Sequence, residues 1–482
     1  MPKPTSKARF AGPKGTRDLY PDDLLRQRYI TQAWRDTAIR HGFDEIAGPT
    51  FETADLYAVK SGDGILGELF QAYSGKSPEE VEQVRETGRA PYALRPEFTP
   101  TIARMYAARA GSLPSPCRWF TAGPYFRAER PQRGRLREFL QWNCDVFGGE
   151  DAEQADADLI AVTVDLMASL GLRSGACGVR VNDRRVVALF MEAFGVAEDR
   201  HSAVLAFLDR MPKLSAEERA KQAAQVGLND EAVRALSSEA SEQQHEPDQR
   251  SAGALAAWQD ASFETYQRLM AALDARLGLV RDGWVTIDQS IVRGLAYYTG
   301  TVFELIADGE RAVAGGGRYD NLIELFGGPP TPAVGFGMGD VVLTNLLDDR
   351  KLMPEGAELR DAVSKPPASL RPEAFVFGAN DEAADHVVRL VAKLRRGVEQ
   401  ADFDGKPWDE NRYVVPPMHA RKSDKATRNV GKLLKDASTQ RARFAVIVES
   451  ADKASVKDLG TGEQRELGLD EVPAAIAAGL HV

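Results

Sequence analysis

The apolar positions of this chain follow two spacings, one typical of helices and the other of strands. Apolar residues recur every three to five positions over Asp22–His41, which predicts an amphipathic helix that ends near Gly42. Short apolar runs at Phe43–Ile46, Cys117–Ala122 and Phe139–Phe147 predict strands. Because a largely polar segment separates the last two runs, we expect them to pair as an antiparallel hairpin with a long loop.

The same spacings continue through the middle of the chain. Residues 151–172 predict a helix that closes at Gly171, and Thr99–Ala110 predicts another. Residues 186–276 are rich in Ala, Glu and Gln with few β-branched residues, which predicts a helical insertion. Strand patterns then return at three places, Trp284–Ile287, Thr299–Leu305 and Ala333–Phe336.

A change of composition marks a separate unit at the end of the chain. Residues 354–371 are rich in Pro and in small or polar residues, and this composition predicts a linker. Beyond it, strand and helix patterns alternate as β-α-β-α-β, which is typical of a small α/β domain over residues 372–482. The strands are expected at Phe375–Phe377, Tyr413–Val415 and Phe444–Val448, and the helices at Ala383–Gln400 and Lys425–Ala437.

Composition and charge narrow the class of protein. The chain has 482 residues, 43% of them hydrophobic and 27% charged, so it is expected to be a globular protein of more than one domain. Its 61 basic and 71 acidic residues give a net charge of −10, which argues weakly against a nucleic-acid partner. Cys117, Cys144 and Cys177 are odd in number and lack CxxC spacing, so we expect neither a zinc site nor a disulfide framework.

No segment of the sequence is typical of a membrane span or an export signal. The first twenty residues lack the apolar stretch of a secretory signal. No run approaches the roughly 18 apolar residues that a spanning helix needs. We therefore expect a cytoplasmic protein in a reducing compartment, with no membrane partner.

An Arg-rich segment separates the two strands of the expected hairpin. Phe126–Phe139 holds five arginines within eleven positions, and guanidinium groups bind phosphates bidentately and stay charged. A loop of this kind suits a polyphosphate or the end of a nucleic acid. The alternative is a solvated loop whose arginines pair with Glu129 and Glu138, and the residues alone leave both interpretations open. The five are Arg127, Arg130, Arg133, Arg135 and Arg137.

Two further segments carry candidate chemistry. Asp288–Thr301 places Arg293 near two tyrosines, Tyr297 and Tyr298, and beside a glycine that lets a ligand approach the backbone closely. A tight turn with aromatic packing is the simpler interpretation of that segment alone. Gly315–Asp320 has neither the phosphate-loop spacing nor the dinucleotide-binding pattern, so alone it is weak evidence for any site.

Taken together, these segments closely resemble the class II aminoacyl-tRNA synthetases, and specifically the histidyl-tRNA synthetase family. Gly42–Pro49 is similar to the first motif of the class, which builds the dimer interface, and Phe126–Phe139 is similar to the second motif. Arg293–Tyr298 and Gly315–Asp320 resemble the two signatures peculiar to the histidine enzymes. The tail from residue 372 onward is similar to the anticodon-binding domain of the family.

The resemblance implies an α+β fold, a class II antiparallel-sheet catalytic core with a helical insertion, followed by a small α/β anticodon-binding domain. The core would comprise residues 1–185 and 277–353, the insertion residues 186–276, the linker residues 354–371 and the anticodon-binding domain residues 372–482. The implied reaction activates L-histidine with ATP to histidyl-adenylate and transfers the histidyl group to the 3′ end of its tRNA. The resemblance also implies a homodimer and Mg²⁺, for which the sequence indicates no ligands.

The site residues of the family match positions of this sequence one by one. Arg127 and Arg293 match the two arginines that hold the α-phosphate from opposite sides, so they are the expected catalytic and ATP-binding residues. Phe139 matches the ring on which adenine stacks. The expected histidine-binding residues are Glu97, Thr99 and Gln141 around the amino group, Asp145 and Tyr298 at the imidazole, and Tyr297 and Tyr319 along the pocket wall.

Two positions depart from the family pattern. The third motif normally ends in a Glu-Arg pair whose arginine packs on the adenine and reaches the γ-phosphate, but Val341 and Val342 occupy those places here. Ala296 stands where the family often has Asp. The main alternative is a non-catalytic paralogue that senses histidine as a regulatory subunit of ATP phosphoribosyltransferase. The nearly complete signatures and the tail count against this alternative.

The distribution of charge changes the first impression given by its sum. From Arg421 to Arg443 there are eight basic and two acidic residues, so a net charge of 8 − 2 = +6 lies in one segment of the tail. With the Arg-rich loop, this gives two basic regions, one for each end of a tRNA. The tRNA-binding residues expected in the tail are Arg421, Lys422, Lys425 and Arg428.

Overall fold

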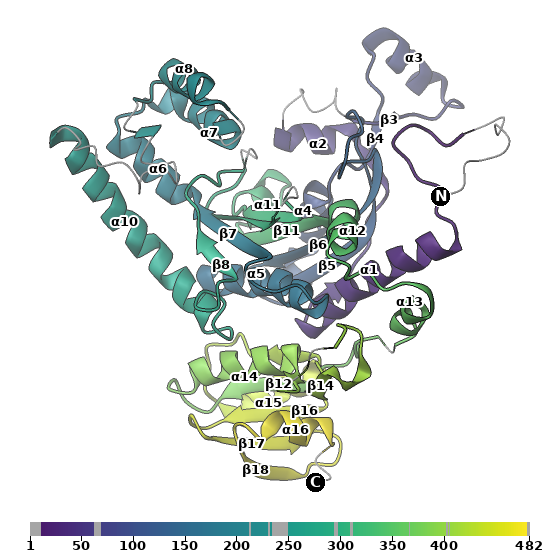
Figure 1. The fold of residues 1–482 in the computed structure, drawn as a ribbon, viewed down its shortest axis with the longest axis vertical. Coiled ribbons are helices and arrows are strands. Elements are labelled where there is room, and N and C mark those ends of the chain that lie inside the picture. Colours follow the sequence, from purple (N-terminus) through teal and green to yellow (C-terminus); the bar gives the residue numbers. More distant parts are fainter. Residues whose placement is uncertain are drawn as a thin grey trace.

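The computed structural model describes residues 11–61, 69–211, 214–229, 232–233, 249–293, 297–308, 312–365, 367–401, 403 and 405–479. Figure 1 shows a central sheet with helices packed against it, a group of helices beside the sheet, and a separate unit formed by the C-terminal segment. Within these ranges, no helix is both long enough and apolar enough to cross a membrane.

An eight-stranded sheet forms the centre of the core. Most neighbouring strands are antiparallel, whereas β1 pairs with β5, and β7 with β8, in parallel. The expected hairpin is confirmed, because β5 and β6 pair from Cys117 opposite Phe147 to Phe126 opposite Glu138. The antiparallel-sheet core is therefore also confirmed. In sheet order the strands are β1 (Asp44–Glu45), β5 (Cys117–Phe126), β6 (Glu138–Phe147), β11 (Ala333–Gly339), β10 (Ala314–Arg318), β9 (Thr301–Ala307), β7 (Cys177–Asp183) and β8 (Val285–Ile287).

The largest hydrophobic core lies between one face of this sheet and the helices α1 (Pro21–Arg40) and α5 (Ala152–Ser169). Trp34 of α1 stacks on Trp142 of β6 with ring centroids 6.1 Å apart, and Phe336 of β11 meets the same ring edge-on. Burial of one such side chain contributes on the order of 1.5–3 kcal/mol. Both helices were expected from the apolar spacing, and both are confirmed.

The edge of the core contains elements that the apolar pattern did not predict. A three-stranded sheet forms beside α2 (Ala54–Ser61), and α3 (Pro78–Thr87) projects from it (Figure 1). Strands of two or three residues are too short to show alternation, which is why periodicity missed them. The strands are β2 (Phe51–Thr53), β4 (Tyr92–Leu94) and β3 (Gln71–Ala72). The other core helices are α4 (Thr99–Ala107), which confirms the helix expected at Thr99–Ala110, α11 (Leu322–Leu325) and α12 (Asp340–Asp349).

The helices of the segment expected to be an insertion share one hydrophobic cluster. Phe190, Phe207 and Trp258 are buried in it, and the indole N–H of Trp258 donates to the Val186 carbonyl at 3.0 Å. The helices are α6 (Arg184–Ala193), α7 (His201–Arg210), α8 (Ala216–Val226) and α10 (Gln249–Asp274).

The C-terminal unit is a five-stranded sheet in the order β15-β12-β16-β17-β18, whose first three strands are parallel. The strand expected at Tyr413–Val415 is confirmed, but it lies outside this sheet. Tyr413–Val415 (β14) does not join the sheet, because it pairs with β13 (Val398–Glu399) in a separate two-stranded ribbon. The remaining elements are β12 (Ala374–Gly378), α14 (Ala384–Arg396), β15 (Ala420–Lys422), α15 (Val430–Thr439), β16 (Phe444–Val448), β17 (Lys453–Asp458), β18 (Gln464–Gly468) and α16 (Val472–Ala477).

The C-terminal unit is attached to the core by polar contacts as well as by the chain. Arg412 is fully buried and donates to the carbonyls of Ala168 and Ser169 at 2.9 and 3.0 Å. These carbonyls lie at the C-terminal end of α5, where a cation also interacts favourably with the negative end of the helix dipole. Part of the segment expected to be a linker is helical, since α13 (Gly356–Val363) packs against α1.

Candidate active site

The alternation of side chains along β6 separates the core from the candidate site. Trp142 and Cys144 face the helices α1 and α5 and are completely buried there. Successive side chains of a strand point to opposite faces, so Gln141, Asn143 and Asp145 lie together on the other face. All three are buried polar residues, which is unusual in a sheet unless the residues bind one another or a ligand.

Glycines on the two neighbouring strands leave room above this face. In register, Gly335 and Gly337 of β11 lie opposite Asp145 and Asn143, and Gly317 and Gly315 of β10 continue the same rows. A Cβ on each glycine would collide with a site residue. The distances would be 2.7 Å to Asp145 Cγ from Gly335, 2.9 Å to Gln141 Nε2 from Gly337, 2.9 Å to Tyr298 Cδ1 from Gly317 and 2.7 Å to Arg293 Nη2 from Gly315.

A cavity of about 460 Å³ lies over these glycines. It is a polar cavity, since carboxylates, guanidiniums, amides and phenols all reach its wall. The structure brings together eight of the ten residues expected in the catalytic core here: Glu97, Thr99, Arg127, Gln141, Arg293, Tyr297, Tyr298 and Tyr319.

Asp145, the ninth of these residues, lies beneath the cavity wall. Its carboxylate accepts a hydrogen bond of 2.5 Å from the Tyr319 hydroxyl, and both side chains are buried. Burial, reinforced by the Asp145 carboxylate, raises the pKa of Tyr319 well above its ordinary value. The phenol therefore keeps its proton and donates a hydrogen bond to Asp145, and this bond fixes the orientation of the carboxylate.

Arg127 is a partly buried cation among other charges. Burial lowers the pKa of Arg127, the guanidiniums of Arg135 and Arg293 lower it further, and Glu97 and Glu129 act in the opposite direction. The guanidinium also lies 5.1 Å from the centroid of the Phe139 ring. A partly buried cation that neighbouring cations destabilise is stabilised by a bound anion, so this end of the cavity favours phosphate or carboxylate groups.

Arg293 occupies a strained backbone position on the facing side of the cavity. Its φ is 51°, in the left-handed region that non-glycine residues rarely adopt. Burial alone would lower its pKa, but Tyr298 and Glu304 outweigh this effect and raise it. Arg293 Nη1 donates to Glu304 at 2.7 Å, whereas its buried Nε has no acceptor among the described residues. Gly294, Leu295 and Ala296, which complete this signature, lie outside the described residues.

A second cavity of about 580 Å³ continues from the first. Phe139, the tenth expected residue, lines it, and Val341 and Val342 line it too. The two valines lie in the first turn of α12, so the start of this helix presents aliphatic side chains to the cavity. Arg127, Gln141, Arg293 and Glu304 are among the residues that line both cavities, so the two form one continuous site.

Four polar residues that line the first cavity were not among the expected site residues: Glu129, Arg135, Asn143 and Glu304. Arg135 lines both cavities and is paired with Glu129 across the Arg-rich loop, and Asn143 accepts a hydrogen bond of 2.9 Å from Gln141. Glu304 completes the set. The two-residue alternation from Gln141 to Asp145 could have identified Asn143. Glu304 lies on β9 and carries no local signal.

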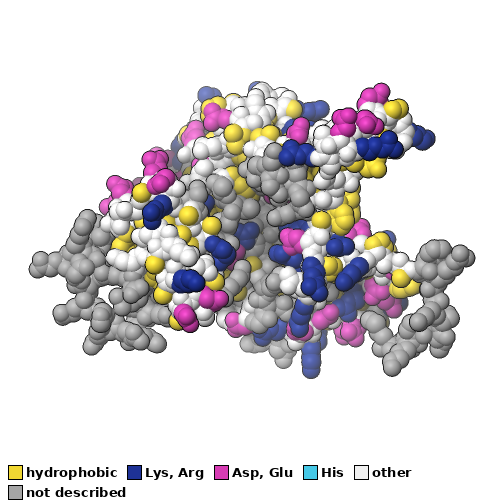
Figure 2. Space-filling model, turned by 90° about the horizontal axis from the view of Figure 1, so that it is seen from above, with side chains coloured by type: hydrophobic (Ala, Val, Ile, Leu, Met, Phe, Trp, Pro, Cys, Tyr) yellow, Lys and Arg dark blue, Asp and Glu magenta, His cyan; other side chains and the backbone are white. Residues whose placement is uncertain are grey.

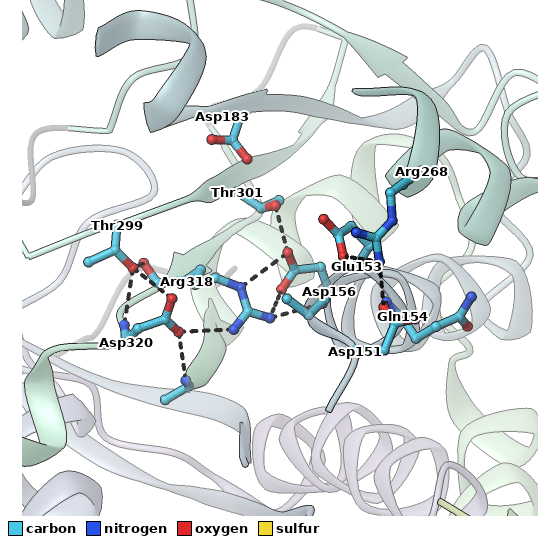
Figure 3. A network of polar contacts seen from close by, with 12 residues as sticks. Asp151, Glu153, Gln154, Asp156, Asp183, Arg268, Thr299, Thr301, Arg318 and Asp320 are labelled. Carbon is cyan, nitrogen blue, oxygen red and sulfur yellow. Dashed lines mark hydrogen bonds and ion pairs between the residues drawn. The ribbon is translucent and has the colours of Figure 1, made fainter. Parts of the chain in front are cut away.

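A buried ionic network supports the site from below (Figure 3). Asp156 of α5 binds Arg318 at 2.5 Å and accepts a hydrogen bond of 2.6 Å from Thr301. Arg318 also binds Asp320 at 2.9 Å. The network joins α5, β9 and the end of β10 directly before Tyr319, so the position of Tyr319 depends on buried charges that are already paired.

The basic residues expected to bind tRNA lie where the C-terminal unit meets the core. Each has a carboxylate partner: Arg421 binds Asp44 at 2.9 Å, Lys422 binds Asp424 at 2.7 Å, Lys425 binds Asp436 at 3.0 Å and Arg428 binds Asp381 at 2.8 Å. The side chains of Arg421 and Lys422 are only 20% and 16% exposed, against 54% and 41% for Lys425 and Arg428. Lys425 and Arg428 are thus the more accessible pair.

Among the described residues, the surface above the core carries side chains of both charges. In Figure 2, which views the molecule from above Figure 1, acidic and basic side chains are interspersed. Among the described residues, no group of three or more His, Cys, Asp or Glu side chains could hold a metal ion.

Comparison with known proteins gives consistent matches. Residues 15–340 match the family model of histidyl-tRNA synthetase. A histidine–tRNA ligase of Haloarcula marismortui is 33% identical over 95% of this chain and 96% of its own length. The solved histidyl-tRNA synthetase of Nostoc shares the fold, with a TM-score of 0.56 at 21% identity over 98% of this chain and 100% of that one. An ATP phosphoribosyltransferase regulatory subunit/histidyl-tRNA synthetase of Bacillus halodurans shares the fold as well, with a TM-score of 0.51 at 20% identity over 93% of this chain and 100% of that one.

Proposed function

Because the chain belongs to the histidyl-tRNA synthetase family and is a histidine–tRNA ligase, we propose that the continuous cavity binds ATP and L-histidine side by side. The histidine carboxylate attacks the α-phosphorus, the bond to the bridging oxygen breaks, and pyrophosphate leaves. The resulting histidyl-adenylate then passes its histidyl group to the 3′ end of the tRNA. The observation that carries this proposal is the pair of guanidiniums of Arg127 and Arg293, which line one cavity. Beneath this cavity lies the glycine floor, which is formed by Gly315, Gly317, Gly335 and Gly337.

The two arginines suit the first step for an electrostatic reason. Negative charge is distributed over the oxygens of the α-phosphoryl group as the carboxylate attacks, and fixed cations stabilise it without reorganising. Arg127 approaches from the β5–β6 hairpin and Arg293 from the segment before β9, and both line each of the cavities. The unsatisfied Nε–H of Arg293 would donate a hydrogen bond to an α-phosphate oxygen.

Histidine recognition is proposed at the end of the cavity near Asp145. Tyr319 orients the Asp145 carboxylate, which would accept a hydrogen bond from an imidazole N–H. Glu97, Thr99 and Gln141 would hold the α-ammonium group. An amino acid without these polar groups would leave buried donors and acceptors unpaired, which is the usual origin of strong discrimination.

The nucleotide is proposed to occupy the second cavity. Phe139 offers a ring for adenine to stack on, while Val341 and Val342 cover the adenine with aliphatic groups in place of an arginine. Arg135 lines both cavities and is placed to take the contact with the outer phosphates. Mg²⁺ would be held by those phosphates together with Glu304, a carboxylate that lines both cavities; when bound, it would neutralise phosphate charge.

Partners and compartment follow from the same family. We propose that Arg421, Lys422, Lys425 and Arg428 contribute to tRNA binding, with Lys425 and Arg428 making the more accessible contacts. We also propose a homodimer, to which the exposed side chains of Phe51, Val59 and Tyr73 around β2, α2 and β3 would contribute apolar surface. The proposed compartment is the cytoplasm, where the three buried free cysteines would stay reduced.

The regulatory-subunit alternative predicts histidine binding without adenylate formation. The likeness to the Bacillus halodurans protein shows the fold alone at 20% identity, so it does not favour that alternative. The test is histidine-dependent exchange of labelled pyrophosphate into ATP. We expect exchange by the intact protein and a loss of about 10²–10³-fold in Arg127→Ala. Histidine binding with no exchange in the presence of Mg²⁺ and ATP would contradict the proposal.

A further inference from the structure

The segment that precedes α1 lies across the Arg-rich loop. The Gly15 carbonyl accepts a hydrogen bond of 2.8 Å from the backbone N–H of Arg137. Gly15 has φ 91°, and a Cβ at this position would lie 2.6 Å from Pro131 Cγ. Glycine therefore lets the chain lie flat against the loop at a point where a side chain would push the two apart.

Arg17, two residues further on, fastens the same segment to the start of α12. Its Nη2 donates to Asp340 Oδ2 at 2.6 Å. Asp340 is almost fully buried, with a side chain that is 2% exposed, and its other oxygen accepts from the backbone N–H of Leu140 at 2.9 Å. One carboxylate thus joins the N-terminal segment, the strand β6 and the helix α12.

The location of this carboxylate connects it with the nucleotide site. Leu140 stands between Phe139, which lines the second cavity, and Gln141, which lines both. Asp340 directly precedes the two valines at the positions of the Glu-Arg pair. Without Arg17, an uncompensated buried carboxylate would lie beside the cavity proposed for a triphosphate, and the N-terminal segment would lose its anchor.

We propose that Arg17 is a positioning residue for ATP. By pairing with Asp340 it holds residues 12–17 against the Arg-rich loop, so that Arg127 and Arg135 are kept in place for the phosphates. It also neutralises the carboxylate at the start of α12. Arg17 lines neither cavity, so it acts through the loop and through Asp340 rather than on substrate. This inference rests on the proposed function of the cavity.

The test separates ATP binding from histidine binding. Calorimetry with Mg²⁺-ATP and with histidine gives the two Kd values without turnover, and pyrophosphate exchange gives the two KM values. Loss of a hydrogen-bonded ion pair that serves only the nucleotide half should weaken ATP binding about tenfold in Arg17→Ala. Histidine binding should change by less than about twofold. Arg17→Lys should retain part of the ATP affinity because it keeps the charge.

Arg26→Ala is the matched control, because Arg26 also pairs with α12, at Asp348, and within the described ranges it makes no hydrogen bond or ion pair with the loop. It should leave both affinities unchanged. Asp340→Asn keeps an acceptor for the backbone N–H of Leu140 but loses the charge. In that background, Arg17→Ala should weaken ATP binding by less than a further factor of about two. Unchanged ATP affinity in Arg17→Ala, parallel losses for both substrates, or full additivity with Asp340→Asn would overturn the proposal. If the intact protein shows no pyrophosphate exchange while Arg17→Ala still weakens ATP binding, the proposed function is refuted and the positioning role of Arg17 stands.

Discussion

The glycine floor predicts that one methyl group at position 335 disables histidine recognition. The strand at Gly335 has ordinary extended geometry, so alanine fits the backbone and the effect is purely steric. The new Cβ would lie 2.7 Å from Asp145 Cγ and 3.1 Å from the Tyr319 hydroxyl oxygen. Ordinary contacts between such atoms are at least about 3.4 Å, so the Asp145 carboxylate must move away.

The magnitude follows from what this movement breaks. The 2.5 Å hydrogen bond between Tyr319 and Asp145 is buried, and overpacking of a well-packed site costs about 1–3 kcal/mol. A displaced carboxylate would leave the imidazole N–H without its acceptor, which raises KM for histidine by roughly 10–100-fold. KM for ATP should change little, because Gly335 lines only the first cavity.

The assay is pyrophosphate exchange at varied histidine and at varied ATP, together with thermal denaturation. Gly339→Ala is the comparison on the same strand and face, since a Cβ there would meet no atom closer than Phe139 Cδ2 at 4.0 Å. It should leave KM for histidine unchanged and alter the melting temperature little. If Gly335→Ala has a normal KM for histidine, or raises both KM values equally, the assignment of the imidazole end to Asp145 is wrong.

Two further predictions concern the contact between the core and the C-terminal unit. Burial lowers the pKa of His41 to about 4, so the unfolded chain takes up this proton first and the free energy of unfolding falls as pH drops from about 6.5 to 4, by up to ~1.4 kcal/mol per pH unit. His41→Asn should therefore flatten the acid side of a plot of melting temperature against pH; an unchanged slope in His41→Asn would contradict this reasoning. Charge reversal of Lys425 and Arg428 together should raise KM for tRNA roughly tenfold and leave pyrophosphate exchange unchanged, while Lys453→Glu on β17 should change neither; equal tRNA charging by the double variant would exclude this surface.

The sequence predicted the elements that have long apolar patterns and missed those that depend on distant partners. The helices α1 and α5 and the hairpin of β5 and β6 were predicted because each pattern is complete within one segment. The role of the glycines was not predictable from their own segment, since each collides with a side chain from another part of the chain. Tyr413–Val415 has a strand pattern, but a pattern does not specify which partner the strand pairs with.

The candidate residues were found by resemblance, whereas their arrangement required the fold. Tyr319 and Asp145 are hydrogen-bonded although 174 positions separate them. Arg135 was counted among five arginines of one loop, and only the cavity distinguishes it from Arg133, which pairs with Asp349 on the surface. The valines of the third motif were recognised as a departure, but their place on the cavity wall beside Phe139 came from the structure.

The geometry of the site and the stability of the core depend on the same register. Along β6, residues that face the helices alternate with residues that face the cavity, so a slip of one position would exchange Trp142 for Gln141. Such a slip would bury an amide against Trp34 and place an indole over the glycine floor, and each change alone costs several kcal/mol. The apolar packing under the sheet therefore holds Gln141, Asn143 and Asp145 in position, although the stacked rings of Trp34 and Trp142 line neither cavity.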